Sequence, residues 1–178
     1  MSELEGVALG VVHTLQPCTS YAVRMEFERS PSTRWSASAG SIYPLLKRLE
    51  ERGLVASSVD PEDGRGRRLL EVTPEGREGL EVWVAGGVDP AVVAAVEDPL
   101  RSRVFFLGLL PAPVRAAFLS GAESALRGFM AATRERLAES EASGDRLRQL
   151  ADLGAVYQAE ARVRWIEAVR DALGGGSG

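Results

Sequence analysis

The sequence predicts a mainly α-helical chain with one small β-hairpin: a winged helix-turn-helix followed by an α-helical dimerisation domain. Two observations lead to this fold class. Three segments of helical periodicity, two short β-rich segments around a glycine-bearing loop and another helix follow one another within about the first 85 residues. The rest of the chain is helical in pattern, and its last helix is apolar on two faces. We expect domains at residues 1–87 and 88–173, with 174–178 (GGGSG) a flexible linker or tail.

The first two helices are delimited by proline and by capping residues. Residues 3–16 have apolar residues at helical spacing, and this helix ends before Pro17 because a residue preceding proline disfavours the α region. Thr19 or Ser20 can cap the second helix, since their hydroxyl oxygens accept hydrogen bonds from free N–H groups of the first turn. The segment 30–32 (SPS) ends it.

The third helix is expected within SASAGSIYPLLKRLEERGLV, residues 36–55. At 100° per residue one face holds four aliphatic residues that must point into the core: Ile42, Leu45, Leu46 and Leu49. The opposite face and its shoulders hold Gly40, Tyr43, Pro44, Lys47, Arg48 and Glu51. Pro44 cannot donate to the carbonyl of Gly40, so we expect a bent or irregular first turn.

This polar side has the residue types expected of a helix that lies against DNA. Gly40 and Pro44 have little bulk to hold the backbone away from a groove, Tyr43 offers a hydroxyl, and Lys47 and Arg48 offer cations. Phosphate contacts of this kind fix a helix in register on a duplex. The predicted contacts on this helix are Ser41, Tyr43, Pro44, Lys47 and Arg48.

The segments 54–59 and 68–72 are β-rich and flank a turn-dense loop, which predicts a hairpin. Arg65, Arg67 and Arg68 are three cations within four residues beside this turn. Arginine forks bind phosphate oxygens well and can enter a narrow minor groove. Acidic residues just before them weaken the field, and the loop alone favours an ordinary solvated hairpin. Together with the preceding helix, it favours DNA contact.

The remaining segments are helical. Thr73 caps the helix after the hairpin, with Pro74 at its first position. Further helices are expected at 99–110, about 114–140 and 145–173. One apolar stripe of the last helix consists of Leu153, Val156, Val163, Ile166, Val169 and Leu173, and the other of Leu150, Gly154, Tyr157, Ala161, Trp165 and Ala168. The first can serve the same chain and the second a partner chain, which predicts a homodimer; the alternative is a three-helix packing within one chain.

Charge and composition restrict the function classes. The net charge is −4, and residues 1–87 and 88–178 are both net negative, so a DNA-binding surface must be a local patch. No apolar run approaches the roughly 18 residues of a spanning helix, and no secretory signal is visible. We expect a soluble cytoplasmic protein without membrane contact.

The chain offers little for catalysis or metal binding. It has one histidine, His13, and one cysteine, Cys18, so a zinc site is not expected, and neither is any cofactor. Cys18 fits burial better than a redox-sensing role. No phosphate-binding loop or Ser-His-Asp set stands out, so we expect no enzyme. Trp83 fits core or interface packing better than stacking on an effector, which stays the alternative, and Trp35 and Trp165 are expected in the core.

The segments GSIYPLLKRLEERGLV (40–55) and GRGRRLLEVTPEGREGL (64–80) resemble the PadR family of bacterial transcriptional regulators. The matching positions are Gly40, Ser41, Ile42, Tyr43, Pro44, Leu46, Arg48, Leu49, Glu50, Gly53, Leu54, Thr73 and Gly76. The resemblance covers roughly residues 3–87. VRWIEAVRDAL (163–173) more weakly resembles the helical C-terminal part of the subgroup related to virulence-gene activators.

The resemblance implies a homodimeric winged-helix repressor on a palindromic operator of double-stranded DNA, with Tyr43 and the third helix at the operator. It also implies a response to a phenolic or drug-like small molecule in some members. Ser20 stands where the family often has glycine, and Leu70 where an aromatic residue is common. The alternative function is a winged-helix protein–protein docking module without affinity for duplex DNA.

Overall fold

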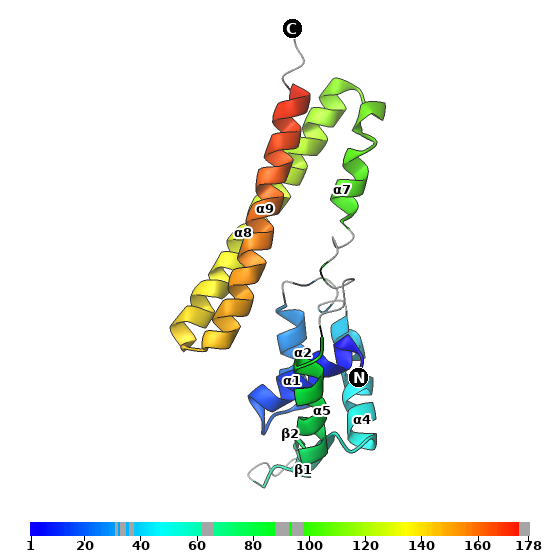
Figure 1. Cartoon of the computed structure of the whole chain (residues 1–178), viewed down its shortest axis with the longest axis vertical. Helices are drawn as coiled ribbons and strands as arrows, with labels where there is room; N and C mark the ends of the chain where they lie inside the picture. The colour runs from blue at the N-terminus through cyan, green and yellow to red at the C-terminus, as the bar shows by residue number, and fades with distance from the viewer. Residues whose placement is uncertain are drawn as a thin grey trace. The chain divides into compact units, whose positions relative to one another are not determined.

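The computed structural model describes residues 1–30, 32, 35, 38–61, 66–87, 93 and 98–174, and the chain divides into two compact units, 1–94 and 95–178 (Figure 1). The first unit contains α1 (Glu3–Leu15), α2 (Ser20–Glu28), η1 (Ala39–Ser41), α4 (Ile42–Glu51), β1 (Val55–Val59), β2 (Arg68–Val72) and α5 (Pro74–Val84). The second contains α7 (Pro99–Val104), η2 (Leu107–Leu109), α8 (Ala112–Ser143) and α9 (Arg146–Gly174). The predicted fold class, helical with one hairpin, is confirmed.

Local sequence signals define the starts of the helices in the first unit. The Ser2 side chain accepts from the Glu5 N–H while Glu5 accepts from the Ser2 N–H, a capping box that starts α1. Two contacts lower the pKa of Glu5. One is the hydrogen bond from the Ser2 N–H, and the other is the Arg52 guanidinium, which lies 2.7 Å from the Glu5 carboxylate. Thr19 caps α2 and Thr73 caps α5, as predicted.

The helices of the first unit enclose one hydrophobic core. Its buried residues are Val7, Ala8, Leu9, Val12, Cys18, Val23, Phe27, Ala39, Ile42, Leu45, Leu46, Leu49, Val55, Leu70 and Leu80. The members from α4 are the four aliphatic residues that helical spacing assigned to the core. The predicted orientation of this helix is therefore confirmed.

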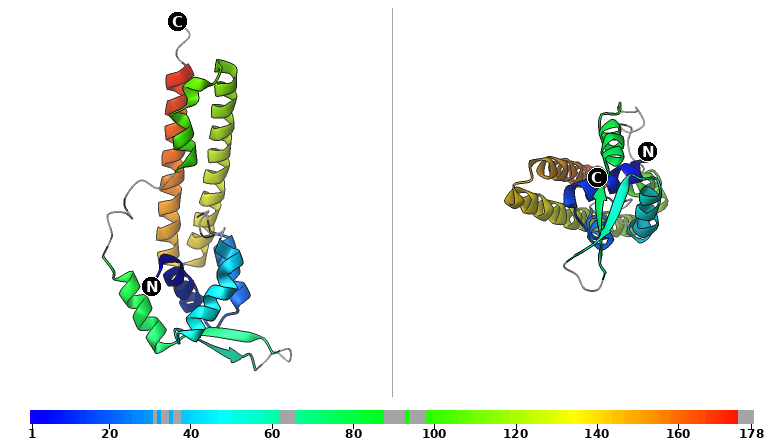
Figure 2. Two further views of the ribbon diagram at one scale, coloured as in Figure 1. Left: turned by 90° about the vertical axis from the view of Figure 1, so that its right-hand side faces the viewer. Right: turned by 90° about the horizontal axis from the view of Figure 1, so that it is seen from below.

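The hairpin pairs Val55 with Val72 and Val59 with Arg68 in an antiparallel register (Figure 2). Gly53 lies between α4 and β1 with φ +73°, a conformation that glycine adopts without strain. Gly76 on α5 lies so close to Leu54, the residue before β1, that an added Cβ would meet the Leu54 carbonyl oxygen at 2.0 Å. These contacts fix the base of the hairpin between α4 and α5.

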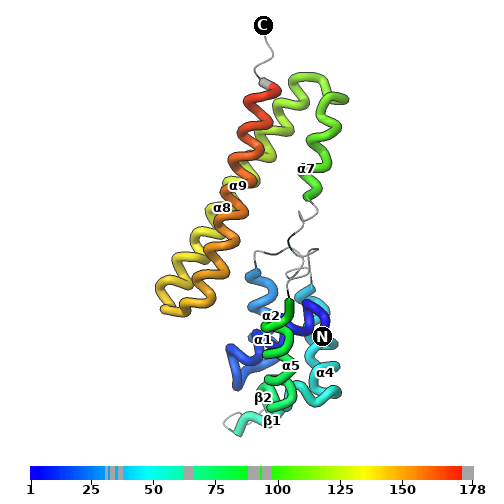
Figure 3. The backbone as a smooth tube through the Cα atoms, viewed as in Figure 1, coloured from blue at the N-terminus to red at the C-terminus, as the bar shows by residue number. Residues whose placement is uncertain are grey.

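The second unit is built on the antiparallel pair α8 and α9, which lie side by side along their length (Figures 1 and 3). The pair buries Leu119 and Leu126 of α8 against Val163 and Ile166 of α9. Ion pairs between the two helices include Arg134 with Glu160, 2.7 Å apart. Among the described helices, none combines the length and apolar content of a membrane span.

Two helix boundaries in this unit differ from prediction. The helix expected at 99–110 ends at Val104 and gives way to a turn and η2, and Leu110 is extended before Pro111, as residues preceding proline prefer. The helix α8 begins at Ala112 because Pro113 is accommodated in its first turn, where no intrahelical N–H is needed.

The two stripes of α9 differ in exposure. In the first stripe Val156, Val163 and Ile166 are buried, although Leu173 near its end is 40% exposed. In the second stripe Leu150 and Tyr157 are exposed. One apolar face of α9 is thus used within the chain, and the other is largely open.

Candidate nucleic-acid interface

The exposed side of α4 carries the predicted contact residues. Tyr43 is 45% exposed, and Ser41, Pro44, Lys47 and Arg48 are exposed as well. The turn before α4 is a 3-10 segment, and Pro44 is the third residue of α4, where its nitrogen needs no intrahelical partner. The Ser41 hydroxyl donates to the Ser38 carbonyl oxygen at 2.8 Å within this turn. The four aliphatic residues of α4 are buried in the core, so the core fixes the orientation of its outer side.

Two cations lie on or beside this side of α4: Lys47 has a weak ion-pair partner, and Arg24 lies next to Tyr43. Lys47 lies 3.7 Å from Glu51, and both side chains are largely exposed, so this pair adds little stability. Arg24 of α2 pairs with Glu28 at 2.5 Å, and the Glu28 carboxylate and then the Tyr43 hydroxyl raise the pKa of Arg24. Packing of α2 against α4 thus brings a cation beside Tyr43 that the sequence analysis did not identify.

The structure separates the three arginines of the predicted wing. Arg65 lies outside the described residues. Arg67 is exposed, and one of its guanidinium nitrogens lies 3.9 Å from the Asp60 carboxylate. Arg68 turns to the end of α4, where its guanidinium lies 2.7 Å from the Glu50 carboxylate and also contacts the Ser57 hydroxyl. Glu50 and Ser57 were not among the predicted site residues.

The other singled-out residues of this unit have packing or surface positions. Cys18 is buried, and burial raises the pKa of its thiol, which disfavours the reactive thiolate. His13 is exposed, with Gln16 as a neighbour at 3.4 Å. Within the described ranges, no group of His, Cys, Asp and Glu could hold a metal ion.

Two tryptophans of the first unit lie at the edge of its core. Trp83 packs over Gly6, where an added Cβ would meet the indole ring at 2.4 Å. Trp35 contacts Phe27, with ring centroids 6.3 Å apart. Both are half-buried, as is Trp165 in the second unit, and Trp35 and Trp165 pack against the cores of their units, as expected. The predicted effector contact of Trp83 stays a prediction.

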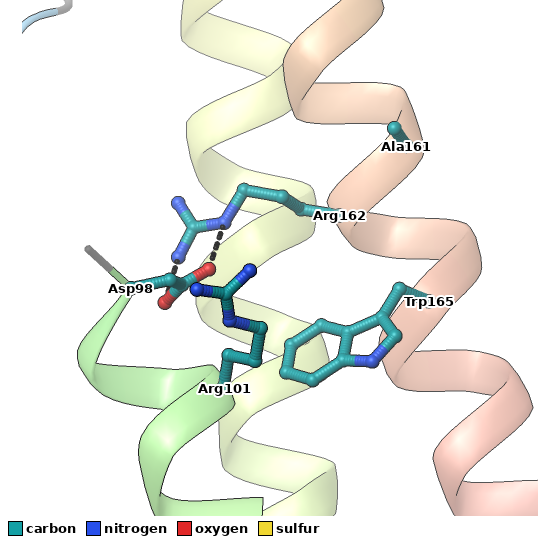
Figure 4. Close-up of a pocket in the computed structure, with 5 residues that line it drawn as sticks. All are labelled: Asp98, Arg101, Ala161, Arg162 and Trp165. Atoms are coloured by element: carbon teal, nitrogen blue, oxygen red, sulfur yellow. Dashed lines mark hydrogen bonds and ion pairs between the residues drawn. The ribbon is translucent and has the colours of Figure 1, made fainter. Parts of the chain in front are cut away.

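The second unit has a small surface pocket of about 210 Å³ between α7 and α9 (Figure 4). Its lining residues are Asp98, Arg101, Ala161, Arg162 and Trp165. Arg162 is held by both carboxylate oxygens of Asp98, at 3.0 and 3.1 Å. The Arg101 guanidinium points into the space between Asp98 and the Trp165 ring (Figure 4). The pocket thus combines an aromatic surface with a cation.

Comparison with known structures shows the fold. Bacillus subtilis PadR in complex with operator DNA superposes with a TM-score of 0.84 at 18% identity, over 97% of this chain and 98% of that chain. The same protein in complex with p-coumaric acid gives a TM-score of 0.75 at 16% identity, over 97% and 98%. The Vibrio cholerae virulence activator AphA gives 0.74 at 22% identity, over 97% and 99%.

Comparison by sequence identifies the family of residues 8–82. The transcriptional regulator Rv3488 of Mycobacterium tuberculosis is 46% identical over 46 residues, which cover 26% of this chain and 43% of that protein. The family model described as the transcriptional regulator PadR-like family matches residues 8–82, a range that includes α4, both strands and most of α5. The family consists of regulators rather than enzymes. Residues 8–82 of this chain therefore form a domain of the PadR-like family of transcriptional regulators.

Proposed function

We propose that this protein regulates transcription by binding double-stranded DNA through the exposed side of α4 and through the hairpin. The observation that carries the proposal is the division of α4 into a fully buried aliphatic face and an outer side bearing a tyrosine and two cations. A helix supported in this way can lie in a groove while its polar residues contact phosphates. The complex of Bacillus subtilis PadR with operator DNA supports the proposal.

The sequence analysis expects contacts from Ser41, Tyr43, Pro44, Lys47, Arg48, Arg65, Arg67 and Arg68, and we propose all of these except Arg68, whose guanidinium pairs with Glu50. Their cations lie on a chain of net charge −4, so their effect is local and depends strongly on salt. Residues 1–87 would act as the DNA-binding domain and residues 88–173 as the dimerisation and effector domain.

The exposed stripe of α9 supports a homodimer. Leu150 and Tyr157 are uncovered, and Gly154 and Ala161 on the same stripe would allow a second helix to approach closely. A two-fold dimer presents two copies of α4 and therefore fits a palindromic operator. Repression by occupancy of such an operator is the mode of action that we propose.

We further propose that a small aromatic anion releases the protein from DNA. The pocket beside Trp165 supports this, because an aromatic ring can stack on the indole while Arg101 pairs with a carboxylate. The p-coumaric acid complex of Bacillus subtilis PadR supports the same class of effector. Titration with p-coumaric acid should quench tryptophan fluorescence and weaken operator binding, and Arg101→Ala should reduce both effects. If Arg101→Ala and Trp165→Phe respond like the unaltered protein, the effector binds elsewhere, with Trp83 as the next candidate.

The decisive test of DNA binding is fluorescence anisotropy with a duplex of the promoter region beside the protein's own gene. Affinity should fall steeply as salt increases, because binding through phosphates releases counterions. Lys47→Ala should weaken binding without changing the thermal midpoint, whereas Arg77→Ala on α5, an exposed cation outside the proposed contact set, should bind normally. Absence of duplex affinity at any salt concentration would favour the protein–protein docking module instead.

A further inference from the structure

Side chains from β1 and β2 meet on one carboxylate oxygen of Glu50, near the end of α4. The Ser57 hydroxyl of β1 donates to Glu50 Oε1 at 2.5 Å. The Arg68 guanidinium of β2 donates to the same oxygen at 2.7 Å and also contacts the Ser57 hydroxyl. We call Glu50, Ser57 and Arg68 the wing cluster. It joins both strands of the hairpin to the end of the helix that carries the proposed DNA contacts.

The wing cluster lies where apolar packing of the hairpin ends. On the hairpin face that turns toward the core, Val55 and Leu70 are buried, but Val59 is 63% exposed. Arg68 is the register partner of Val59 and shares its face. The hydrophobic core therefore holds only the base of the hairpin, and the half near the loop depends on polar contacts.

Among the described residues, the hydrogen bonds that join β2 to the connection between α1 and α2 also lie in the half of the hairpin away from the loop. Cys18 and Leu70 exchange two backbone hydrogen bonds, of 3.1 and 2.7 Å. The Gln16 side chain accepts from the Val72 N–H at 2.8 Å. These bonds tie the middle and end of β2 to the connection between α1 and α2, whereas its first residue, Arg68, contacts α4 through Glu50.

We propose that Glu50, Ser57 and Arg68 are positioning residues that set the direction of the wing relative to α4, so that Arg68 acts on DNA through Glu50 rather than as a phosphate contact. This inference rests on the proposed DNA-binding function. A hairpin that swings about its base would carry Arg67 away from the phosphates that α4 addresses. Two fixed surfaces, by contrast, bind one duplex without further ordering.

The two roles of Arg68 predict opposite effects at Glu50. If Arg68 contacts a phosphate, replacing Glu50 with an uncharged residue frees the guanidinium and removes a negative charge near DNA, so binding tightens. If the wing cluster positions the hairpin, the same replacement releases the wing and weakens binding. The sign of the change at Glu50 therefore distinguishes the two roles.

The experiment measures anisotropy of the promoter duplex with the full chain over a salt series. Glu50→Gln, Arg68→Gln and Ser57→Ala should each weaken binding by about fivefold per protomer with an unchanged salt slope. The exchange Glu50→Arg with Arg68→Glu should restore most of the affinity, because it rebuilds the pair in reverse while leaving no cation at position 68. Glu71→Gln removes an exposed carboxylate of β2 outside the wing cluster and should not weaken binding.

Thermal midpoints measured beside the affinities separate positioning from unfolding. The Arg68 side chain is 64% exposed, so all three single variants should fold. Tighter or unchanged binding by Glu50→Gln, with a salt slope reduced by about one per protomer in Arg68→Gln, would overturn the proposal and make Arg68 a phosphate contact. If the exchanged pair does not fold, Ser57→Ala decides, because wild-type affinity of this uncharged replacement would also overturn it. Lack of duplex affinity in the unaltered protein would overturn the proposed function and this inference together.

Discussion

The two units of the chain use their apolar residues differently. In the first unit, α1, α2, α4 and the hairpin surround one core, and the outer side of α4 is mainly polar. In the second unit, large apolar side chains remain outside, with Phe105 and Leu109 each 82% exposed and Tyr157 61% exposed. The first unit buries the aliphatic face of α4 in its own core, although Val82 and Val84 of α5 are 69% and 71% exposed, whereas in the second unit one stripe of α9 is largely open and resembles half of a core. Stability and association should therefore respond to different substitutions in the two units.

The largest expected effect is the loss of association on removal of α9. Deletion from Asp145 onward strips α8 of the partner that buries Leu119 and Leu126, so the product should be monomeric or aggregated. The first unit should stay folded, because the described residues of its core all belong to residues 1–94. Light scattering after size exclusion measures the mass, and circular dichroism the helical content. A well-folded dimer that survives the deletion would show that the interface lies elsewhere.

A pair of glycine replacements tests the difference in packing. In Gly76→Ala the new Cβ would meet the Leu54 carbonyl oxygen, which is held by the Thr73 N–H at 3.2 Å. We expect a loss of about 2–3 kcal/mol in the free energy of unfolding, measured by urea titration. In Gly154→Ala the Cβ would enter open space on an exposed helix face, so the chain alone should gain up to about 1 kcal/mol.

The same pair can locate the partner surface. If the chains meet along the exposed stripe of α9, Gly154→Ala should weaken the dimer even though it suits the isolated helix. Equal destabilisation by Gly76→Ala and Gly154→Ala in a monomeric sample would contradict the claimed difference between the units.

The sequence predicts the first unit better than the second for physical reasons. Four aliphatic residues at helical spacing leave only one orientation for α4, and Gly53 and Thr73 delimit the hairpin, so both strands were found at nearly their observed bounds. The break between α7 and η2 depends on packing of Leu107 in the second core, which has no local signal. The α7 boundary could not be read from periodicity alone.

The site residues that the sequence analysis missed are held by contacts between residues far apart in the sequence. Arg68 was predicted to face DNA because it follows a glycine-rich turn, but Glu50, 18 residues earlier, provides a carboxylate at the point where the hairpin returns to α4. The pocket beside Trp165 depends on Asp98 and Arg162, which are 64 residues apart. Such pairs follow from tertiary packing and leave no periodic pattern.

Tyr43→Phe tests whether the outer side of the first unit serves binding alone. The ring is retained and is already 45% exposed, so the thermal midpoint should hardly change. Loss of one hydrogen bond to a charged phosphate should cost on the order of 1.5–3 kcal/mol of operator affinity per half-site. Anisotropy and thermal melting on the same samples measure both quantities. Unchanged affinity with lower stability would assign Tyr43 to the core.

The smallest expected effect is that of the wing arginines near the loop. Replacing Arg65 and Arg67 with alanine should weaken binding to all duplexes by on the order of 1 kcal/mol per protomer, because exposed cations contribute modestly and carry no base specificity. The clearer effect is on the salt dependence. The slope of log affinity against log salt concentration should become shallower by roughly 2 per protomer, because two phosphate contacts are lost. Arg77→Ala on α5 removes one exposed cation that pairs with Glu81 at 3.1 Å, and it shows the effect of losing a single positive charge outside the proposed contacts. The thermal midpoint should stay constant in both variants, since the exposed side chains of Arg67 and Arg77 do not belong to the core. An unchanged slope would exclude the loop end of the hairpin from the DNA contacts and leave the outer side of α4 as the DNA-binding surface of the first unit.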